Sequence, residues 1–118
     1  MEEEIIACIK EEDIKYLQSG QVSKHIFPMK RNEAHKKKVP HLIVRVFIVK
    51  KTDSGDFKYL IQKRSQNKSS FPGYYTDSAS GHVLYKKDLN LNIIKENAVR
   101  ELNEELGISD KNLKKLTF

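Results

Sequence analysis

The segment from Arg100 to Ile108, with the sequence RELNEELGI, places three carboxylates within two turns of an expected helix. Because an α-helix turns by about 100° per residue, Glu101, Glu104 and Glu105 fall on one side of it. Carboxylates that close repel one another unless a cation neutralises them. Hard cations such as Mg²⁺ and Mn²⁺ prefer oxygen ligands. The segment therefore predicts a divalent-metal site, although an ordinary amphipathic helix with a solvated acidic flank has the same spacing.

Apolar residues on another side of this segment predict that the helix packs on a core. They recur at the spacing of a buried helical stripe, at Ile94, Ala98, Val99, Leu102 and Leu106. Gly107 stands where a glycine commonly ends a helix. We therefore predict a helix from about Leu91 or Asn92 to Leu106, with its acidic residues at the border of the buried stripe.

The same nine residues resemble the second half of the Nudix box, G-x5-E-x7-R-E-U-x-E-E-x-G-U, where U is a bulky aliphatic residue. Every specified position from Arg100 onward agrees. Gly81 is the natural opening glycine, but it lies nineteen residues before Arg100 instead of fourteen, which indicates a five-residue insertion within residues 84–92. The box glutamate, which in the family supports the loop and pairs with the arginine, is here Asn92. Glu96, four residues before Arg100, is an alternative partner for it.

The order of motifs further upstream resembles isopentenyl-diphosphate isomerase-like Nudix proteins, over about residues 27–108. The matching positions are residues 30–35 (KRNEAH), His41, residues 42–50, residues 60–65, Lys68, residues 71–75 and residues 80–83. The resemblance implies that three histidines hold a divalent metal, as a second metal site, at His35, His41 and His82. It also implies that basic side chains grip a substrate diphosphate, at Arg31, Arg64 and Lys68.

Two departures favour a hydrolase over an isomerase. The isomerases carry a catalytic cysteine two residues before the third histidine, where this chain has Ser80, and its one cysteine is Cys8. A hydroxyl is a much poorer proton donor than a thiol, whose pKa is about 8.5. In that family, the carboxylates that complete the isomerase site follow the box helix, and this chain ends ten residues after Ile108. The Glu104-Glu105 pair, by contrast, is the hydrolase form of the box.

The resemblance thus implies metal-dependent hydrolysis of a diphosphate linkage in a nucleoside diphosphate-linked or similar small molecule. Gly81, through its carbonyl, and Glu101, Glu104 and Glu105 would bind Mg²⁺ or Mn²⁺, and a metal-bound water would attack phosphorus. Arg100 would orient a glutamate, and the general base stays open. Two alternatives also stay open: an isopentenyl-diphosphate isomerase-like protein, and a catalytically weak diphosphate-binding module.

Composition sets the frame for these expectations. A chain of 118 residues is one domain, which we divide into an N-terminal extension of about residues 1–26 and a Nudix core of about 27–118. The net charge of +6 suits an anionic small-molecule substrate, but its lysines lack the interleaved aromatics of a nucleic-acid surface. The single cysteine fits a reducing compartment, and no apolar run is long enough for a membrane span. We expect a cytoplasmic protein.

The pattern of the chain predicts an α/β fold. Strands are expected at residues 5–9, 42–50, 57–64 and 113–118, with an extended piece at 75–83, a turn at 52–56, and mostly loop or short strand at 21–34. The resemblance implies a Nudix-type α/β/α sandwich with a mixed sheet, incomplete at the C-terminus. Such a sheet would expose an apolar face and an unpaired edge, so we expect marginal stability or association, for which a homo-oligomer is one form.

Overall fold

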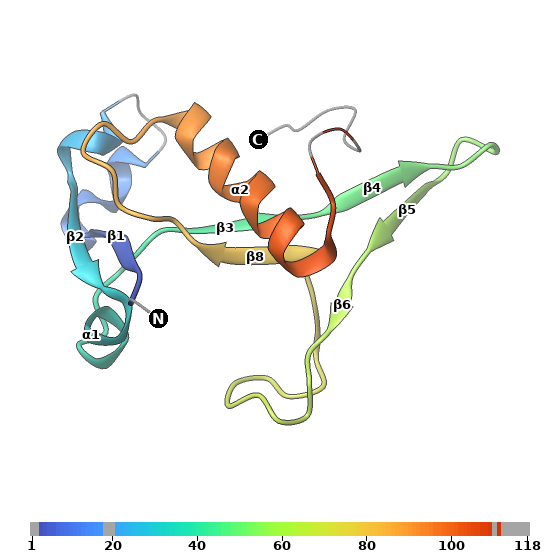
Figure 1. The fold of residues 1–118 in the computed structure, drawn as a ribbon, viewed down its shortest axis with the longest axis horizontal. Coiled ribbons are helices and arrows are strands. Elements are labelled where there is room, and N and C mark those ends of the chain that lie inside the picture. Colours follow the sequence, from blue (N-terminus) through green and yellow to red (C-terminus); the bar gives the residue numbers. More distant parts are fainter. Residues whose placement is uncertain (1–2, 18–20, 110, 112–118) are drawn as a thin grey trace.

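Antiparallel pairs of short strands and two α-helices make up the fold in the computed structural model, which describes residues 3–17, 21–109 and 111 (Figure 1). The strand pairs are β1 (Ile5–Ile9) with β2 (Ile26–Lys30), β3 (Ile43–Val46) with β8 (Ala79–His82), β4 (Ile48–Lys51) with β5 (Phe57–Leu60), and β6 (Gln62–Lys63) with β7 (Tyr75–Thr76). The helices are α1 (Arg31–Lys36) and α2 (Leu91–Leu106), and two 3₁₀ segments are η1 (Glu11–Tyr16) and η2 (Val22–Lys24). The mixed α/β class predicted from the sequence is confirmed. The strand predicted at residues 113–118 lies outside the described residues.

The region from residue 21 to residue 34 is more regular than the loop or short strand that we predicted. It contains η2, β2 and the start of α1. A proline within β2, Pro28, weakens its strand pattern, and the six residues of α1 are too few to repeat a helical period. Contacts from the preceding chain stabilise the start of α1, because the Glu3 carboxylate accepts from the Asn32 amide at 2.6 Å.

The single strand predicted at residues 42–50 is divided at Phe47 into β3 and β4, which pair with different partners. Buried Ser78 lies at the division. Its amide donates to the Val46 carbonyl at 2.9 Å, and its hydroxyl accepts from the Ile48 amide at 2.7 Å and donates to the Leu60 carbonyl. The Ser78 side chain thus takes up hydrogen bonds where the two strands separate, which no apolar pattern reveals.

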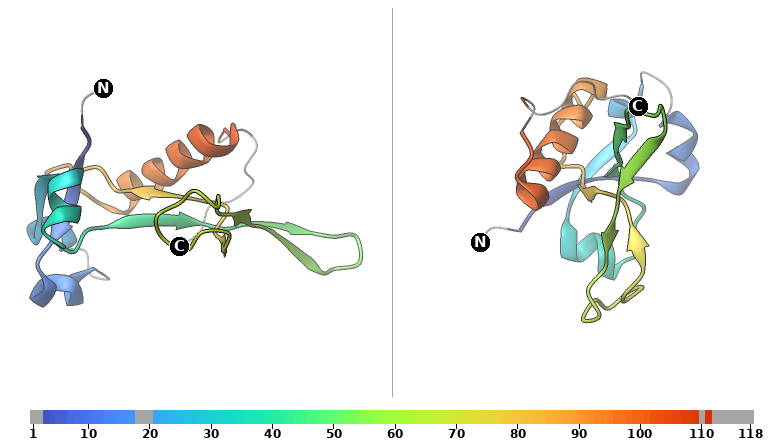
Figure 2. Two further views of the ribbon diagram at one scale, coloured as in Figure 1. Left: turned by 90° about the horizontal axis from the view of Figure 1, so that it is seen from below. Right: turned by 90° about the vertical axis from the view of Figure 1, so that its right-hand side faces the viewer.

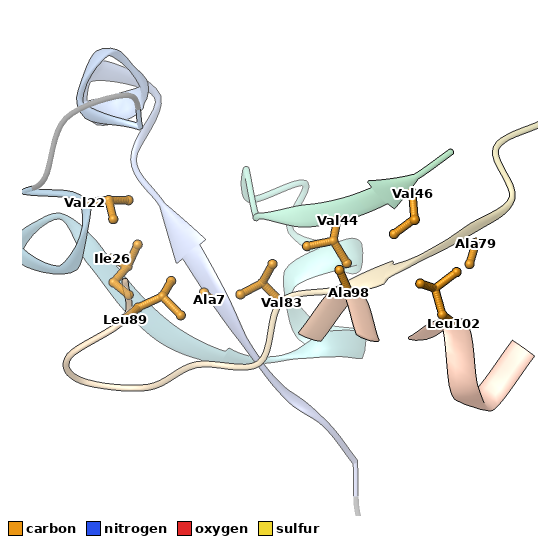
Figure 3. Close-up of a cluster of buried hydrophobic side chains, with 10 residues drawn as sticks. All are labelled: Ala7, Val22, Ile26, Val44, Val46, Ala79, Val83, Leu89, Ala98 and Leu102. Carbon is orange, nitrogen blue, oxygen red and sulfur yellow. The ribbon is translucent and has the colours of Figure 1, made fainter. Parts of the chain in front are cut away.

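Helix α2 lies against one face of the β3–β8 pair (Figure 1), and its predicted bounds are confirmed. The Asn90 side chain accepts from the Ile93 amide at 3.0 Å at the helix start. At its end Gly107 has φ of +67°, which a glycine adopts without strain. The stripe packs as predicted at Ala98 and Leu102, which are buried in the main core with Ala7, Val22, Ile26, Val44, Val46, Ala79, Val83 and Leu89 (Figure 3).

The hairpin of β4 and β5 exposes large apolar side chains. β4 and β5 project from the rest of the molecule as a long hairpin (Figure 2), and the radius of gyration is 15.8 Å, against about 13.5 Å for a compact domain of this length. The pairing of Val49 with Tyr59 and of Lys51 with Phe57 places three large apolar side chains on one face. Val49, Phe57 and Tyr59 are 46 to 63% exposed, and Phe47 and Ile61, at the ends of the hairpin, are 53% and 48% exposed. The exposed apolar face expected from the sequence is therefore present, and association through it stays a prediction.

We expect the two faces to differ sharply in what they contribute to stability. Replacing the fully buried Leu102 by alanine should lower the free energy of unfolding by about 2–5 kcal/mol, because it opens a cavity in the core. Replacing Tyr59, which is 63% exposed, by alanine should cost less than about 1 kcal/mol. Urea unfolding followed by circular dichroism measures both. Similar losses for the two variants would mean that the hairpin face is covered in solution.

Candidate metal and diphosphate site

Three histidine side chains converge where α1, the segment after it and the end of β8 meet. One ring nitrogen from each of His35, His41 and His82 lies within 4.8 Å of the others. The Nε2 atoms of His35 and His82 are 2.9 Å apart, and the three ring centroids are 5.0 to 5.2 Å from one another. Within residues 3–17, 21–109 and 111, this is the one group of three or more potential metal-ligating side chains that converges in this way.

Backbone pairing with β1 fixes two of these histidines. The Ala7 amide donates to the Val83 carbonyl, and the Ala7 carbonyl accepts from the Leu42 amide, both at 2.9 Å. Residues 83 and 42 directly follow His82 and His41, so one residue of β1 holds the two segments beside each other. β1 is buried at Ala7, which protects these hydrogen bonds from water.

The third histidine is positioned by the helix that carries it. Its neighbour Ala34 is fully buried and packs with Ile6 and Cys8 of β1 in a second small core. Because α1 is fastened to β1 by this contact, His35 projects toward the other two rings. The lone cysteine thus lies in a packing cluster behind the histidines, where burial raises the pKa of its thiol.

The electrostatic setting keeps one imidazole uncharged. Burial, followed by the Arg31 guanidinium and the two other imidazoles, lowers the pKa of His82 to about 4, and Glu4 opposes the shift. At neutral pH His82 is therefore neutral and carries a lone pair on one ring nitrogen.

The donor set fits a divalent transition metal. Imidazole nitrogens bound to one tetrahedral Zn²⁺ lie about 3.3 Å apart, which the 2.9 Å and 4.8 Å separations here bracket. His41 Nδ1 lies 2.9 Å from the Val39 carbonyl, and a proton on that nitrogen would leave Nε2 to bind a metal. Imidazole suits Zn²⁺, Fe²⁺ or Ni²⁺ better than Mg²⁺ or Mn²⁺, which prefer oxygen. An open hollow of about 470 Å³ adjoins the cluster and is lined by His35, His41, Ala34, Lys38, Val39 and Pro40.

On the other side of β8, helix α2, which carries the box segment, lies close to Gly81. A Cβ atom placed on Gly81 would lie 2.1 Å from the Glu101 carboxyl carbon, so only glycine allows this contact. Glu101 is 8% exposed. Burial raises the pKa of its carboxyl, and Glu104, Glu105 and Glu4 add to the rise, while Arg100 opposes it. Gly81 and the Glu101 carboxylate therefore lie side by side, and a metal site between them stays a prediction.

The other two box glutamates lie on the surface. Glu104 and Glu105 are exposed, and the Glu105 carboxylate accepts from Gln62 of β6 at 3.2 Å. They do not converge with Glu101 in the way that the three histidines converge. Their predicted role as metal ligands stays a prediction.

The basic residues predicted to bind diphosphate lie on two different elements. Arg31, at the start of α1, is near enough to the histidines to lower the pKa of His82. Arg64 and Lys68 belong to the loop between β6 and β7. The Arg64 guanidinium donates to the Ser70 carbonyl at 3.0 Å and to its hydroxyl at 3.3 Å, and Lys68 is exposed. The structure thus places Arg31 at the cluster and the other two on a separate loop.

Two further residues of the site did not stand out in the sequence. Glu4 forms an ion pair with Arg31 at 3.2 Å and with Arg100 at 3.7 Å. Buried Asn97 receives a hydrogen bond from the Leu84 amide at 3.2 Å and one from Arg100 at 3.4 Å. The expected partner Glu96 is exposed, and the ion pairs of Arg100 in the described chain are with Glu4 and Glu101. No periodic signal marks Glu4, because its partners lie far away in the chain.

Comparison with known proteins gives the site a context. The chain is 44% identical to human isopentenyl-diphosphate delta-isomerase 2 over 55 residues. This match covers 43% of this chain and 24% of the relative. It is 33% identical over 88 residues to an isopentenyl-diphosphate Delta-isomerase of Ruegeria pomeroyi, covering 75% and 43%. It is 37% identical over 60 residues to one of Dictyostelium discoideum, covering 47% and 25%.

The chain is similar to isopentenyl-diphosphate isomerases. This supports the predicted Nudix resemblance at the level of the superfamily, and it favours the isomerase-like alternative over the hydrolase interpretation. The chain spans less than half the length of these curated relatives. No family model and no solved structure matches it. No helix in the described part of the chain is long and apolar enough to cross a membrane.

Glu101 should make the stability of the metal-free protein depend on pH. Folding raises the pKa of its carboxyl, so the protein is more stable when this carboxyl is neutral. That contribution to stability is complete below the pKa of the unfolded state, about 4.3, and is lost as the pH rises through the pKa of the folded state. Glu101→Gln removes this loss. The free energy of unfolding of the variant relative to the natural chain should therefore rise between about pH 4 and pH 7. Urea unfolding in the presence of a chelator measures it, and a difference independent of pH would contradict the assignment.

Proposed function

We propose that this chain carries the metal site and the diphosphate-binding residues of an isopentenyl-diphosphate isomerase-like protein. The observation that carries the proposal is the convergence of His35, His41 and His82 within 4.8 Å, at positions where the resemblance implies a divalent metal. The relatives named isopentenyl-diphosphate isomerase support the same reading. The packing of α2 on β3 and β8 is compatible with part of a Nudix-type sandwich.

The charged side chains suit a diphosphate ligand. Arg31 lies beside the histidines, and an arginine can hold two phosphate oxygens at once. The loop after β6 supplies Arg64 and Lys68, which would bind the same diphosphate from the other direction. A bound divalent metal would supply positive charge for anionic oxygens.

Proton transfer in an isomerase needs a donor at the substrate carbon, and we propose Ser80 for this position. Strand alternation puts Ser80 on the same face of β8 as His82, two residues away, while Gly81 faces α2. A serine hydroxyl holds its proton far more tightly than a thiol, whose pKa is about 8.5. We therefore propose that the chain binds isopentenyl diphosphate but isomerises it slowly.

Replacing Ser80 by cysteine should raise the incorporation of solvent deuterium into isopentenyl diphosphate by about tenfold or more, because a thiol is the better proton donor. Mass spectrometry after incubation in D₂O measures the incorporation. Ser69→Cys, a thiol on the exposed loop between β6 and β7, is the matched control and should have no effect. Equal incorporation by the two variants would count against isomerase chemistry at this strand.

The proposed metal site predicts that variants of its histidines lose metal affinity. Co²⁺ should bind the natural chain at one tight site, and visible absorption follows this binding. His35→Gln or His82→Gln should weaken this binding by tenfold or more, because each removes one of three ligands. His25→Gln is the control, since His25 lies beside Tyr16 and Asp13, away from the cluster. Unchanged affinity in the cluster variants would refute the histidine site.

A second candidate function, metal-dependent hydrolysis of a diphosphate linkage, is favoured by the close contact of Glu101 with Gly81. The carbonyl of this strand and the carboxylates of α2 are the oxygen donors that Mg²⁺ prefers. Phosphate release from a panel of nucleoside triphosphates, nucleotide sugars and dinucleotides tests it. Release that depends on Mg²⁺ and disappears in a Glu104→Gln, Glu105→Gln variant would establish the hydrolase, and silence from folded protein would leave the isomerase-like reading.

A further inference from the structure

The arginine of the box segment lacks the partner that the resemblance implies. Asn92, at the position of the box glutamate, is exposed in the first turn of α2. It lies eight residues before Arg100, or about 12 Å along the helix axis, and as an amide it offers the guanidinium no charge. Arg100 nevertheless is only 29% exposed, and its Nε atom is buried with no hydrogen-bond partner. Its orientation therefore depends on contacts of its two Nη groups.

Each Nη group of Arg100 meets a different carboxylate. Nη2 lies 3.0 Å from Glu101 Oε1, on its own helix, and also 3.4 Å from the His82 carbonyl. Nη1 lies 3.7 Å from Glu4 Oε2, just before β1. The other oxygen of the same Glu4 carboxylate, Oε1, accepts from Arg31 Nη1 at 3.2 Å. A single side chain from the N-terminal segment thus bridges two arginines from different helices.

The backbone holds this bridging carboxylate in place. The Glu4 carbonyl accepts from the Arg31 amide at 3.0 Å, and the next carbonyl, that of Ile5, accepts from the Tyr85 amide at 3.0 Å. Glu4 is therefore tied to the start of α1 on one side and to the chain after β8 on the other. Its carboxylate lies where its charge is felt at His82 and at Glu101, since it raises the pKa of both.

We infer that Glu4 is a positioning residue that takes the place of the missing box glutamate and couples the diphosphate-binding Arg31 to Arg100. The inference rests on the proposed function for the role of Arg31, but the Glu4–Arg100 link is independent of it. With Nη1 held by Glu4, the Nη2 and Nε edge of Arg31 has no hydrogen bond to another described residue. That edge is the one that can meet two phosphate oxygens.

The chain offers a closely matched control for this carboxylate. Glu3 is the preceding residue and carries the same charge, but its carboxylate accepts from the Asn32 backbone amide and from no arginine in the described chain. Glu4→Gln and Glu3→Gln therefore change the net charge equally and near the same place. A difference between them reports the contacts of Glu4 with the two arginines.

The first measurement tests the link without metal or ligand. Thermal unfolding midpoints are determined for Glu4→Gln, Arg100→Met and the double variant. If the side chains are coupled, the double variant should lose at least about 2 °C less than the sum of the single losses. The cycle of Glu3→Gln with Arg100→Met should be additive. Additivity in both cycles would overturn the inference.

The second measurement tests positioning with inorganic pyrophosphate as the probe, in the presence of Mg²⁺ and well below the unfolding midpoint. Calorimetry should find binding to Glu4→Gln about threefold or more weaker than to Glu3→Gln, because Arg31 loses its charged anchor. Glu4→Asp, which keeps the charge, should recover most of the affinity. Equal or tighter binding by Glu4→Gln would overturn the inference, since it would mean that Glu4 competes with the anion for Arg31.

The two tests separate this inference from the proposed function. If the natural chain binds no pyrophosphate and no Co²⁺, the proposed function fails, whereas coupling in the thermal cycle still supports Glu4 as the partner of Arg100. If the natural chain binds both and the Glu4 and Glu3 variants behave alike, the proposed function stands and the inference about Glu4 fails.

Discussion

The backbone pairing of β1 with three other segments is the interaction on which the site depends. β1 forms a ladder with β2 on one edge, and on the other it bonds to the chain at Pro40 and Leu42 and at Val83 and Tyr85. These bonds are made in the interior, because Ile6, Ala7 and Cys8 are fully buried, and an unmade buried hydrogen bond costs about 1–3 kcal/mol. The segment read from the sequence as an N-terminal extension is therefore the element that brings the histidines together.

Local signals in the sequence explain which elements could be predicted. Helix α2 combines a repeated apolar stripe with a terminal glycine, so its bounds followed from the pattern, and the structure adds the Asn90 cap at its start. The hairpin of β4 and β5 followed from the polar turn between two apolar runs. The division at Phe47 did not, because it depends on the Ser78 side chain, which enters from a distant part of the chain.

The candidate site could likewise be predicted only in part. The nine residues of the box segment and the order of the histidines are readable because they match a known pattern, but their spacing alone does not say that the three rings meet. The structure supplies that convergence. Glu4 could not be found in advance, since its link to Arg100 joins the first strand to the last helix. A residue that forms an ion pair with a side chain far away in the sequence produces no periodic pattern in its own segment.

Groups of different chemistry lie on opposite sides of β8. His82 joins two other imidazoles on one side, while Gly81 meets the Glu101 carboxylate on the other. Arg100 touches both, through the His82 carbonyl and the Glu101 carboxylate. Glu4 also acts on both sides, because its carboxylate pairs with Arg100 and raises the pKa of His82 and of Glu101. The charge of one carboxylate just before β1 is therefore felt on both faces of β8.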